Sequence, residues 1–281
     1  MKYIDFEEIK HLELQILRKY IDFCNEHQLK YILYAGTLLG AVRHGGFIPW
    51  DDDIDVAMPR PDYNRFLKLV HKYQIAQNLK LYNCYDKASS YWVPIAKLVD
   101  ERTAGNEIFQ GKGVHNGVWI DIFPIDGISS NYQEQKTFFR KINWEKRMLK
   151  LETLPFRFSK NPLKLIKRIL VYPIYLLGKD KNHKIRAIRI NELIQTYSYK
   201  DSTLVSVNND DTSQPHIIEK SVIENTMKTK FEDIEALIPV DYDSYLKVLY
   251  GDYMTLPPAH LRVPVHEFDC WWKEDAITSK E

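Results

Sequence analysis

The sequence predicts an α/β (α+β) fold in which helices surround a small mixed sheet. Two observations indicate this class: long amphipathic segments with helical spacing, and short runs rich in β-branched and aromatic residues between them. The chain has no internal repeat and no low-complexity tract, and its 281 residues are enough to bury a sizeable core. We therefore expect residues 1–281 to form one domain.

Helical periodicity is clearest near the start of the chain. Residues 5–29 are expected to form an amphipathic helix, because apolar side chains recur there at a spacing of three or four. These side chains are Ile9, Leu12, Ile16, Leu17, Tyr20 and Phe23. Pro61 and Asp62 are typical of a helix start, and Gly251 of the end of a helix over residues 242–250. Two more helical segments are expected, at 132–150 and 161–197.

The strand candidates are short apolar runs rich in β-forming residues. They cover residues 31–35, 53–57, 79–85, 91–98 and 118–123. After the first run, Thr37 is expected to cap a short helix over residues 38–43, which His44 and two glycines then end. Asp126 follows a proline closely and is expected in a turn.

The composition narrows the class of protein. A net charge of +1 at pH 7 points to no particular partner, and no nucleic-acid partner is expected. Three widely separated cysteines give neither a disulfide framework nor a zinc pattern, which favours a reducing compartment. The polar start does not resemble a signal peptide, and no apolar run approaches the ~20 residues that span a bilayer. We expect a cytoplasmic protein.

A carboxylate cluster carries the main chemical signal. In a strand, Asp53 and Asp55 project to one face while Ile54 and Val56 point to the core. Two carboxylates on one face repel each other unless a cation lies between them, and hard oxygen ligands suit Mg²⁺. The alternative is an exposed acidic loop, but such a loop does not need the two interleaved apolar residues.

A calcium-binding loop does not fit the same segment. In a loop that begins at Asp51, the sixth position requires glycine and the twelfth requires glutamate. This chain has Val56 and Asp62 at those positions.

Other residues near the cluster are candidates for binding phosphate or metal. Gly36 and Thr37 lie where a strand meets a helix N-terminus, and free backbone N–H groups there favour an anion. Asp121 interrupts an apolar strand, so it is either a third metal ligand or one half of a buried ion pair. Lys97 is either a phosphate contact or a lysine on an edge strand.

The segment after the short helix adds cationic and aromatic candidates. Arg43 and His44 are placed to reach a diphosphate or stabilise a leaving phosphate, although His44 also suits an ordinary loop. Trp119, like Trp50 and Trp92, lies beside these motifs and can face a quaternary ammonium, with core packing as the alternative.

The run GTLLGAVRHGGFIPWDDDIDVAMPR resembles the signature of the LicD family of phosphorylcholine transferases. The resemblance continues through KLVD, WIDIFPID and YGDYMTLPP, and so covers nearly the whole chain. This family includes the fukutin-related proteins and is similar to nucleotidyltransferases of the polymerase-β-like fold. The resemblance therefore implies a polymerase-β-like core with a small mixed sheet, elaborated by helices.

In that fold a Gly-Ser or Gly-Thr turn precedes a strand with two aspartates, and a later strand supplies a third. The resemblance assigns these roles to Gly36 with Thr37, to Asp53 with Asp55, and to Asp121. Asp52 stands where the family pattern has a hydrophobic residue. Asp51 or Asp52 is therefore a further candidate for binding the metal.

The resemblance implies transfer of phosphocholine from CDP-choline to a sugar hydroxyl, with release of CMP. The acceptor would be a cell-surface glycan precursor, such as teichoic acid or lipopolysaccharide. Mg²⁺, or alternatively Mn²⁺, on Asp53, Asp55 and Asp121 would assist in-line transfer, with Asp121 as ligand or general base. The alternatives are another CDP-linked alcohol phosphate such as ribitol phosphate, nucleotidyl transfer, or a scaffold without catalysis.

Residues 140–190 form a basic helical insertion, with 15 Lys and Arg against 3 Asp and Glu. Within it, residues 162–179 mix cationic with apolar side chains around Pro173. One interpretation is a helix that lies on an anionic membrane surface, where lipid-linked glycan acceptors reside. The other is a helix packed on the catalytic domain with its cationic face in water.

Overall fold

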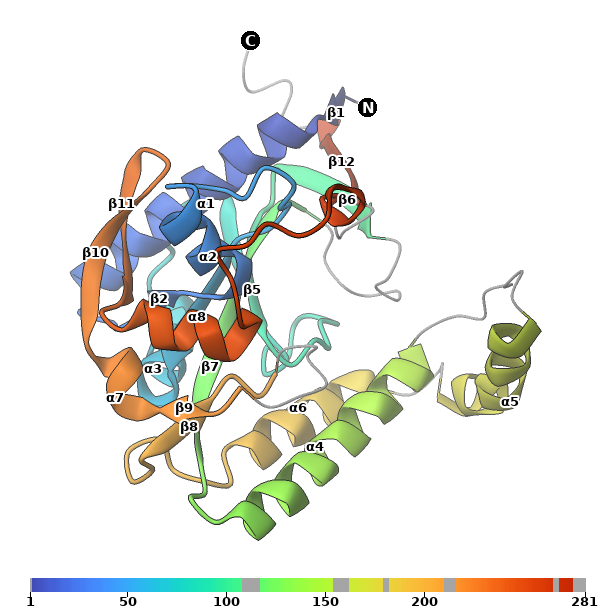
Figure 1. Cartoon of the computed structure of the whole chain (residues 1–281). Coiled ribbons are helices and arrows are strands. Elements are labelled where there is room, and N and C mark those ends of the chain that lie inside the picture. The colour runs from blue at the N-terminus through green and yellow to red at the C-terminus, as the bar shows by residue number, and fades with distance from the viewer. Residues whose placement is uncertain are drawn as a thin grey trace.

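The computed structural model describes residues 2–107, 117–153, 162–178, 182–209, 216–264 and 268–274. Figure 1 shows a curved sheet with helices around it, and α4 and α6 running side by side along one end of the molecule. The helices are α1 (Phe6–Glu26), α2 (Ala35–Arg43), α3 (Arg60–Lys72), α4 (Tyr132–Thr153), α5 (Pro162–Gly178), α6 (His183–Ile194), α7 (Lys220–Glu224) and α8 (Tyr242–Tyr250), with a 3-10 turn at Ala259–Leu261. This content confirms the α/β (α+β) class.

The main sheet has the strand order β2-β3-β7-β5-β4, and β8 pairs with both β7 and β9. Its members are β2 (Ile32–Leu33), β3 (Asp55–Pro59), β4 (Leu79–Tyr82), β5 (Ala96–Asp100), β7 (Trp119–Ile128), β8 (Leu204–Ser206) and β9 (Ile218–Glu219). Only the β3–β7 pair is parallel among the pairings of this sheet in the described residues. The sheet is therefore mixed, as the sequence predicts.

Two smaller antiparallel sheets complete the structure. The first has the order β1-β12-β6, and the second is the hairpin β10–β11. Their strands are β1 (Lys2–Ile4), β6 (Thr103–Glu107), β12 (Phe268–Trp272), β10 (Thr226–Phe231) and β11 (Ile234–Pro239). The strand pairing of β1 with β12 brings the N-terminal and C-terminal parts of the described chain together.

The main core forms where α1 and α3 pack against the sheet. The apolar face of α1 is buried as the periodicity predicts, with Leu17 and Tyr20 fully inaccessible. Asp5 caps this helix, since its carboxylate accepts a hydrogen bond of 2.8 Å from the backbone N–H of Glu8. Val56 and Ile120 on the sheet, and Ile54 just before β3, are fully buried and belong to the same apolar cluster as these helices.

A second, smaller apolar cluster joins α4 and α6. Its buried members are Ile128, Phe138, Ile142, Leu149, Ile190 and Ile194. Arg186 on α6 reinforces the contact, because its guanidinium binds both Glu145 and Glu152 on α4. None of the helices in the described ranges combines the length and the apolar character needed to cross a membrane.

Several predicted boundaries are wrong at the ends of the strands. The strand predicted at 53–57 begins at Asp55, and the one predicted at 91–98 begins at Ala96. The strand predicted at 118–123 continues to Ile128, so Asp126 lies in β7 and not in a turn. The β7 strand is longer because it changes partners, from β5 to β8, along its length.

The predicted helices also differ in detail. The short helix begins at Ala35 with Tyr34 as its N-cap, so the prediction of Thr37 as the cap is wrong. The segment 161–197 contains two helices, α5 and α6. Parts of the predicted basic insertion, at 154–161 and 179–181, lie outside the described residues. The final helix ends where predicted, with Gly251 at φ +67°.

Candidate active site

Three neighbouring strands bring charged side chains into one row. Asp55 on β3 lies opposite Asp121 on β7, and Asp121 lies opposite Lys97 on β5. Side chains that are directly opposite in adjacent strands project to the same face of a sheet. The sheet register therefore unites residues that are far apart in the chain, and it brings together three of the predicted site residues.

Asp53 completes the cluster from the segment just before β3. Carboxylate oxygens of Asp53, Asp55 and Asp121 all lie within 4.8 Å of one another. On the other side, the ammonium of Lys97 lies 3.3 Å from Asp121 Oδ1. The pKa of Asp55 is raised well above its usual range, first by burial and then by the charges of Asp53 and Asp121, while Lys97 opposes the rise.

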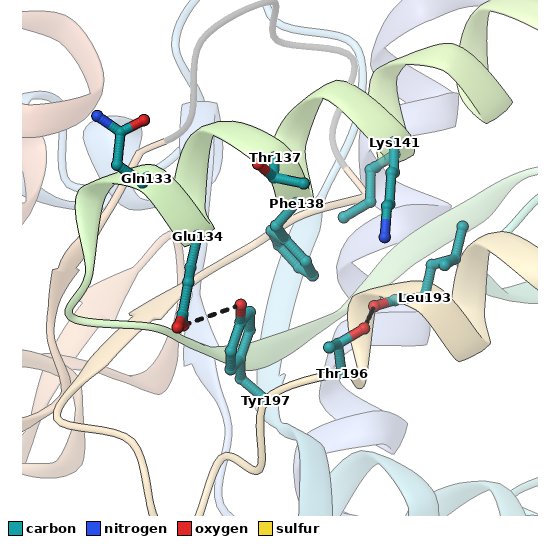
Figure 2. Close-up of a pocket in the computed structure, with 9 residues that line it drawn as sticks. Gln133, Glu134, Thr137, Phe138, Lys141, Leu193, Thr196 and Tyr197 are labelled. Carbon is teal, nitrogen blue, oxygen red and sulfur yellow. Dashed lines mark hydrogen bonds between the residues drawn. The ribbon is translucent and has the colours of Figure 1, made fainter.

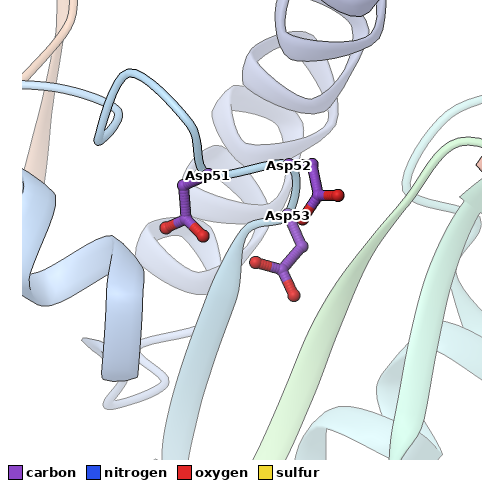
Figure 3. A group of neighbouring side chains, drawn as sticks. All are labelled: Asp51, Asp52 and Asp53. Carbon is purple, nitrogen blue, oxygen red and sulfur yellow. The ribbon is translucent and has the colours of Figure 1, made fainter. Parts of the chain in front are cut away.

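Asp51 and Asp52 extend the acidic surface next to Asp53. Figure 3 shows these three side chains on the loop that leads into β3, and their carboxylate oxygens also lie within 4.8 Å of one another. A Cβ at Gly36 would lie 2.5 Å from Asp51 Oδ2, so a larger residue there would displace the Asp51 carboxylate. Gly36 therefore gives the Asp51 carboxylate room against the first turn of α2.

A further carboxyl group, Glu13, lies behind the cluster and was not among the predicted site residues. It is 3% exposed, and burial followed by the charge of Asp53 raises its pKa well above the usual range. Its sequence signal is its position, since Glu13 shares the apolar face of α1 with Ile9, Ile16 and Leu17. A glutamate at that spacing is unusual enough to indicate a function.

Thr37 positions Asp55 and does not cap a helix. Its hydroxyl accepts a hydrogen bond of 2.8 Å from the backbone N–H of Asp55, and the side chain is 3% exposed. The first turn of α2 is thereby joined to the first residue of β3. The Gly36–Thr37 turn is next to the carboxylates, as predicted, but Thr37 also fixes the strand that carries one of them.

We expect Thr37→Val to lower the free energy of unfolding by about 1–3 kcal/mol, because the partly buried N–H of Asp55 loses its acceptor. Thr37→Ser keeps the hydroxyl and is the matched control. Chemical unfolding monitored by fluorescence measures both variants. Equal stability of Thr37→Val and the wild-type chain would contradict this role.

Arg43 connects two distant motifs near the end of α2. Its Nη1 donates a hydrogen bond of 2.7 Å to the backbone carbonyl of Tyr253, in the YGDYMTLPP segment. His44 follows as the C-cap residue of α2, and its pKa is lowered by burial and then by the charge of Arg43. The imidazole of His44 is therefore mostly neutral at pH 7 and suits hydrogen bonding better than charge neutralisation.

Lys97 and Trp119 form a buried pair beside Asp121. The ammonium of Lys97 lies 3.8 Å from the centre of the Trp119 ring, and the two side chains are 3% and 5% exposed. The interpretation of Lys97 as a lysine on an edge strand is wrong, because β5 lies between β7 and β4. Asp121 is both one half of an ion pair and a member of the carboxylate cluster.

Asp126 and Arg60 form a second buried ion pair, each five residues after Asp121 and Asp55 in turn. Arg60 Nε and Nη2 each donate a hydrogen bond of 2.6 Å to the carboxylate of Asp126. Arg60 is the first residue of α3, immediately after β3, so the pair joins the end of β3 to β7. The pair supports the parallel strands that carry Asp55 and Asp121.

A separate hollow of about 330 Å³ lies between α4 and α6 (Figure 2). At its edge, Glu134 accepts hydrogen bonds from Ser129 at 2.6 Å and from Tyr197 at 3.3 Å. None of the clustered aspartates lines it. The arrangement of charges therefore places the chemistry at the sheet and not in this hollow.

The donor set at the sheet fits a divalent cation. Three carboxylates meet there with one ammonium group, which leaves an excess of negative charge. Burial first, and then the charges of Asp53 and Asp121, raise the pKa of Asp55, and a bound cation relieves the repulsion between these carboxylates. Carboxylate oxygens from two strands and a loop are also the ligand type that Mg²⁺ and Mn²⁺ prefer.

Comparison with known proteins points to the same family as the sequence motifs. Residues 28–163 match the family model described as LicD/FKTN/FKRP, nucleotidyltransferase domain. The chain is 27% identical over 268 residues to the lipopolysaccharide cholinephosphotransferase LicD of Haemophilus influenzae, covering 95% of this chain and 97% of that protein. An uncharacterized protein of Rickettsia typhi is 35% identical over 60 residues, or 21% of this chain. The matched region contains β2, α2, β3, β5 and β7, and with them the carboxylate cluster.

Proposed function

Because this chain belongs to the LicD family, we propose that it is a cholinephosphotransferase that moves phosphocholine from CDP-choline to a sugar hydroxyl of a cell-surface glycan. The observation that carries the proposal is the row of Asp55, Asp121 and Lys97 across three strands, with Asp53 beside it. Lipopolysaccharide is the first candidate acceptor, because the Haemophilus relative is described as acting on it. Teichoic acid is the second candidate.

In this proposal Asp53, Asp55 and Asp121 would hold a magnesium ion, with manganese as the alternative. Such an ion supplies positive charge at a diphosphate, which neutralises the charge that develops on the leaving CMP. The acceptor oxygen forms a bond to the phosphorus that carries choline, the bond from that phosphorus to the CMP oxygen breaks, and the hydroxyl proton leaves to a base. Asp121 is the candidate for that base if it is not a ligand.

The remaining charged residues assist binding and orientation. Lys97 holds Asp121 in place through their ion pair and adds one positive charge at the site. Thr37 and Gly36 set the positions of Asp55 and Asp51. Arg43 and His44, at the end of α2, are proposed contacts for the diphosphate of the donor. Trp119 is proposed to position Lys97, whose ammonium lies against the Trp119 ring.

The same cluster also suits two related reactions. Transfer of another CDP-linked alcohol phosphate, such as ribitol phosphate, uses the same diphosphate chemistry, and nucleotidyl transfer attacks the other phosphorus. The presence of all three carboxylates argues against a scaffold without catalysis. We propose that residues 1–281 act as one catalytic unit, and that the basic helical region 140–190 helps to bind the acceptor.

The decisive experiment is CMP release by the purified protein from CDP-choline, with lipopolysaccharide or a teichoic acid precursor as acceptor. We expect release that depends on Mg²⁺, stops with EDTA and increases with the acceptor. CDP-ribitol and nucleoside triphosphates are the donor controls. Release with CDP-ribitol but not with CDP-choline would overturn the choline assignment and keep the site. If no donor binds and none releases CMP, the proposal that the chain is an enzyme is overturned.

A further inference from the structure

The helix α5 presents an unusually apolar surface to solvent. Six aliphatic side chains lie on one side of this helix, at spacings of three, four and seven, and we call them the apolar strip. They are Leu163, Ile166, Ile169, Leu170, Leu176 and Leu177. Leu163, Leu170 and Leu177 are 72%, 72% and 75% exposed. Single exposed leucines are ordinary on a protein surface, but a continuous strip of this kind marks an interaction site.

One end of α5 is attached to the rest of the protein. Gly178 approaches α4 so closely that a Cβ there would lie 2.5 Å from Glu152 Cγ. Glu152 in turn binds Arg186 on α6. Figure 1 shows α5 beyond the end of α4, separated from the main sheet. The C-terminal end of α5 is therefore packed against α4, while the side chains of the apolar strip are exposed to solvent.

The part of the sequence that contains α5 is strongly basic. Residues 140–190 contain 15 Lys and Arg against 3 Asp and Glu. On α4, Arg140 and Arg147 are exposed and flank Trp144, which is 59% exposed, on one side of the helix. Cationic groups together with an exposed tryptophan and aliphatic side chains are typical of segments that bind the interface of an anionic bilayer.

We propose that the apolar strip of α5 inserts into the headgroup region of an anionic membrane and holds the enzyme on its surface. At 17 residues α5 is about 25 Å long, so it offers a long line of contact when it lies flat. The choice of a lipid surface rests in part on the proposed function, because a lipid-linked glycan acceptor lies there. A second copy of the chain is disfavoured as the partner, since two such basic regions would repel each other.

The test is sedimentation of the full chain with phosphatidylcholine vesicles, with and without phosphatidylglycerol. We expect binding to the vesicles that contain phosphatidylglycerol and weaker binding as salt increases. Leu170→Ser with Leu177→Ser should lower the partition coefficient roughly tenfold or more, because two exposed leucines no longer leave water. The exposure of both side chains means that the domain should still fold.

The matched control is Tyr132→Ser with Val240→Ser, which replaces apolar side chains that are 71% and 53% exposed outside α5. It should bind vesicles as the wild-type chain does. Absence of binding to the anionic vesicles would overturn the proposal. So would a dimer in sedimentation equilibrium that the α5 variant converts to a monomer, because a second copy would then cover the strip. The assay contains no donor or acceptor, so its result is independent of CMP release.

Discussion

Asp55→Asn is expected to lower kcat for CMP release by about a thousandfold or more while the fold stays intact. Asparagine has the same shape as aspartate but lacks the negative charge that holds a divalent cation. Asp53→Asn should have a similar effect, because its carboxylate oxygens lie in the same group within 4.8 Å. Steady-state kinetics with CDP-choline, together with binding of Mn²⁺ followed by electron paramagnetic resonance, measures both consequences.

The stability of these variants separates a role in chemistry from a role in folding. Burial of Asp55 and its repulsion by Asp53 and Asp121 both disfavour its charged form, so removing that charge should not lower the unfolding temperature without metal. Asp22→Asn removes an exposed carboxylate from α1 and is the control for a change in net charge. Full activity of both Asp53→Asn and Asp55→Asn would make the metal assignment wrong.

The carboxylate cluster shows which features of the site local sequence patterns predict and which they do not. Asp53 and Asp55 stand out because charged residues alternate with apolar ones, and Asp121 stands out because it interrupts an apolar run. Their meeting depends on the register of β3 with β7, which pairs Asp55 with Asp121. Register between strands that are distant in the chain is a tertiary property, so the sequence predicts the members of the site better than their arrangement.

Other features of the fold have no strong local signal. The β6 strand, with the sequence TAGNE, lacks apolar alternation and forms because it pairs with β12 near the other end of the chain. Thr37 looks like a helix cap, yet its hydroxyl accepts from Asp55, which only the folded chain brings near. Glu13 becomes significant only because the acidic loop packs against α1.

Asp126 is the most informative of the wrong predictions. A proline two residues earlier and a glycine immediately after suggest a turn, because both residues favour one. In the structure the residue is 1% exposed inside β7, where the guanidinium of Arg60 binds it in two places. A buried charge is tolerated when its partner satisfies it, and the partner lies 66 positions away in the chain.

Arg60→Met is expected to lower the free energy of unfolding by about 3–5 kcal/mol, because it leaves the Asp126 carboxylate buried without its partner. For a chain of this size that corresponds to a fall of roughly 10 °C in the unfolding temperature. Arg60→Met combined with Asp126→Leu should recover most of the loss, since no buried charge remains. The exposed pair of Arg18 with Asp233 provides the control, and Arg18→Met should cost about 1 kcal/mol or less.

The pH dependence of Arg60→Met tests the cause of its instability. Burial already raises the pKa of Asp126 in the wild-type chain, although Arg60 opposes the rise, and loss of Arg60 raises it further. A carboxyl group with a higher pKa in the folded state than in the unfolded state stabilises the fold at low pH, and this contribution is lost as the pH rises through the folded pKa. The deficit of Arg60→Met should therefore grow from about pH 4 to about pH 8. An equal deficit at both values would mean that lost packing, and not the unpaired charge, destabilises the junction of β3 with β7.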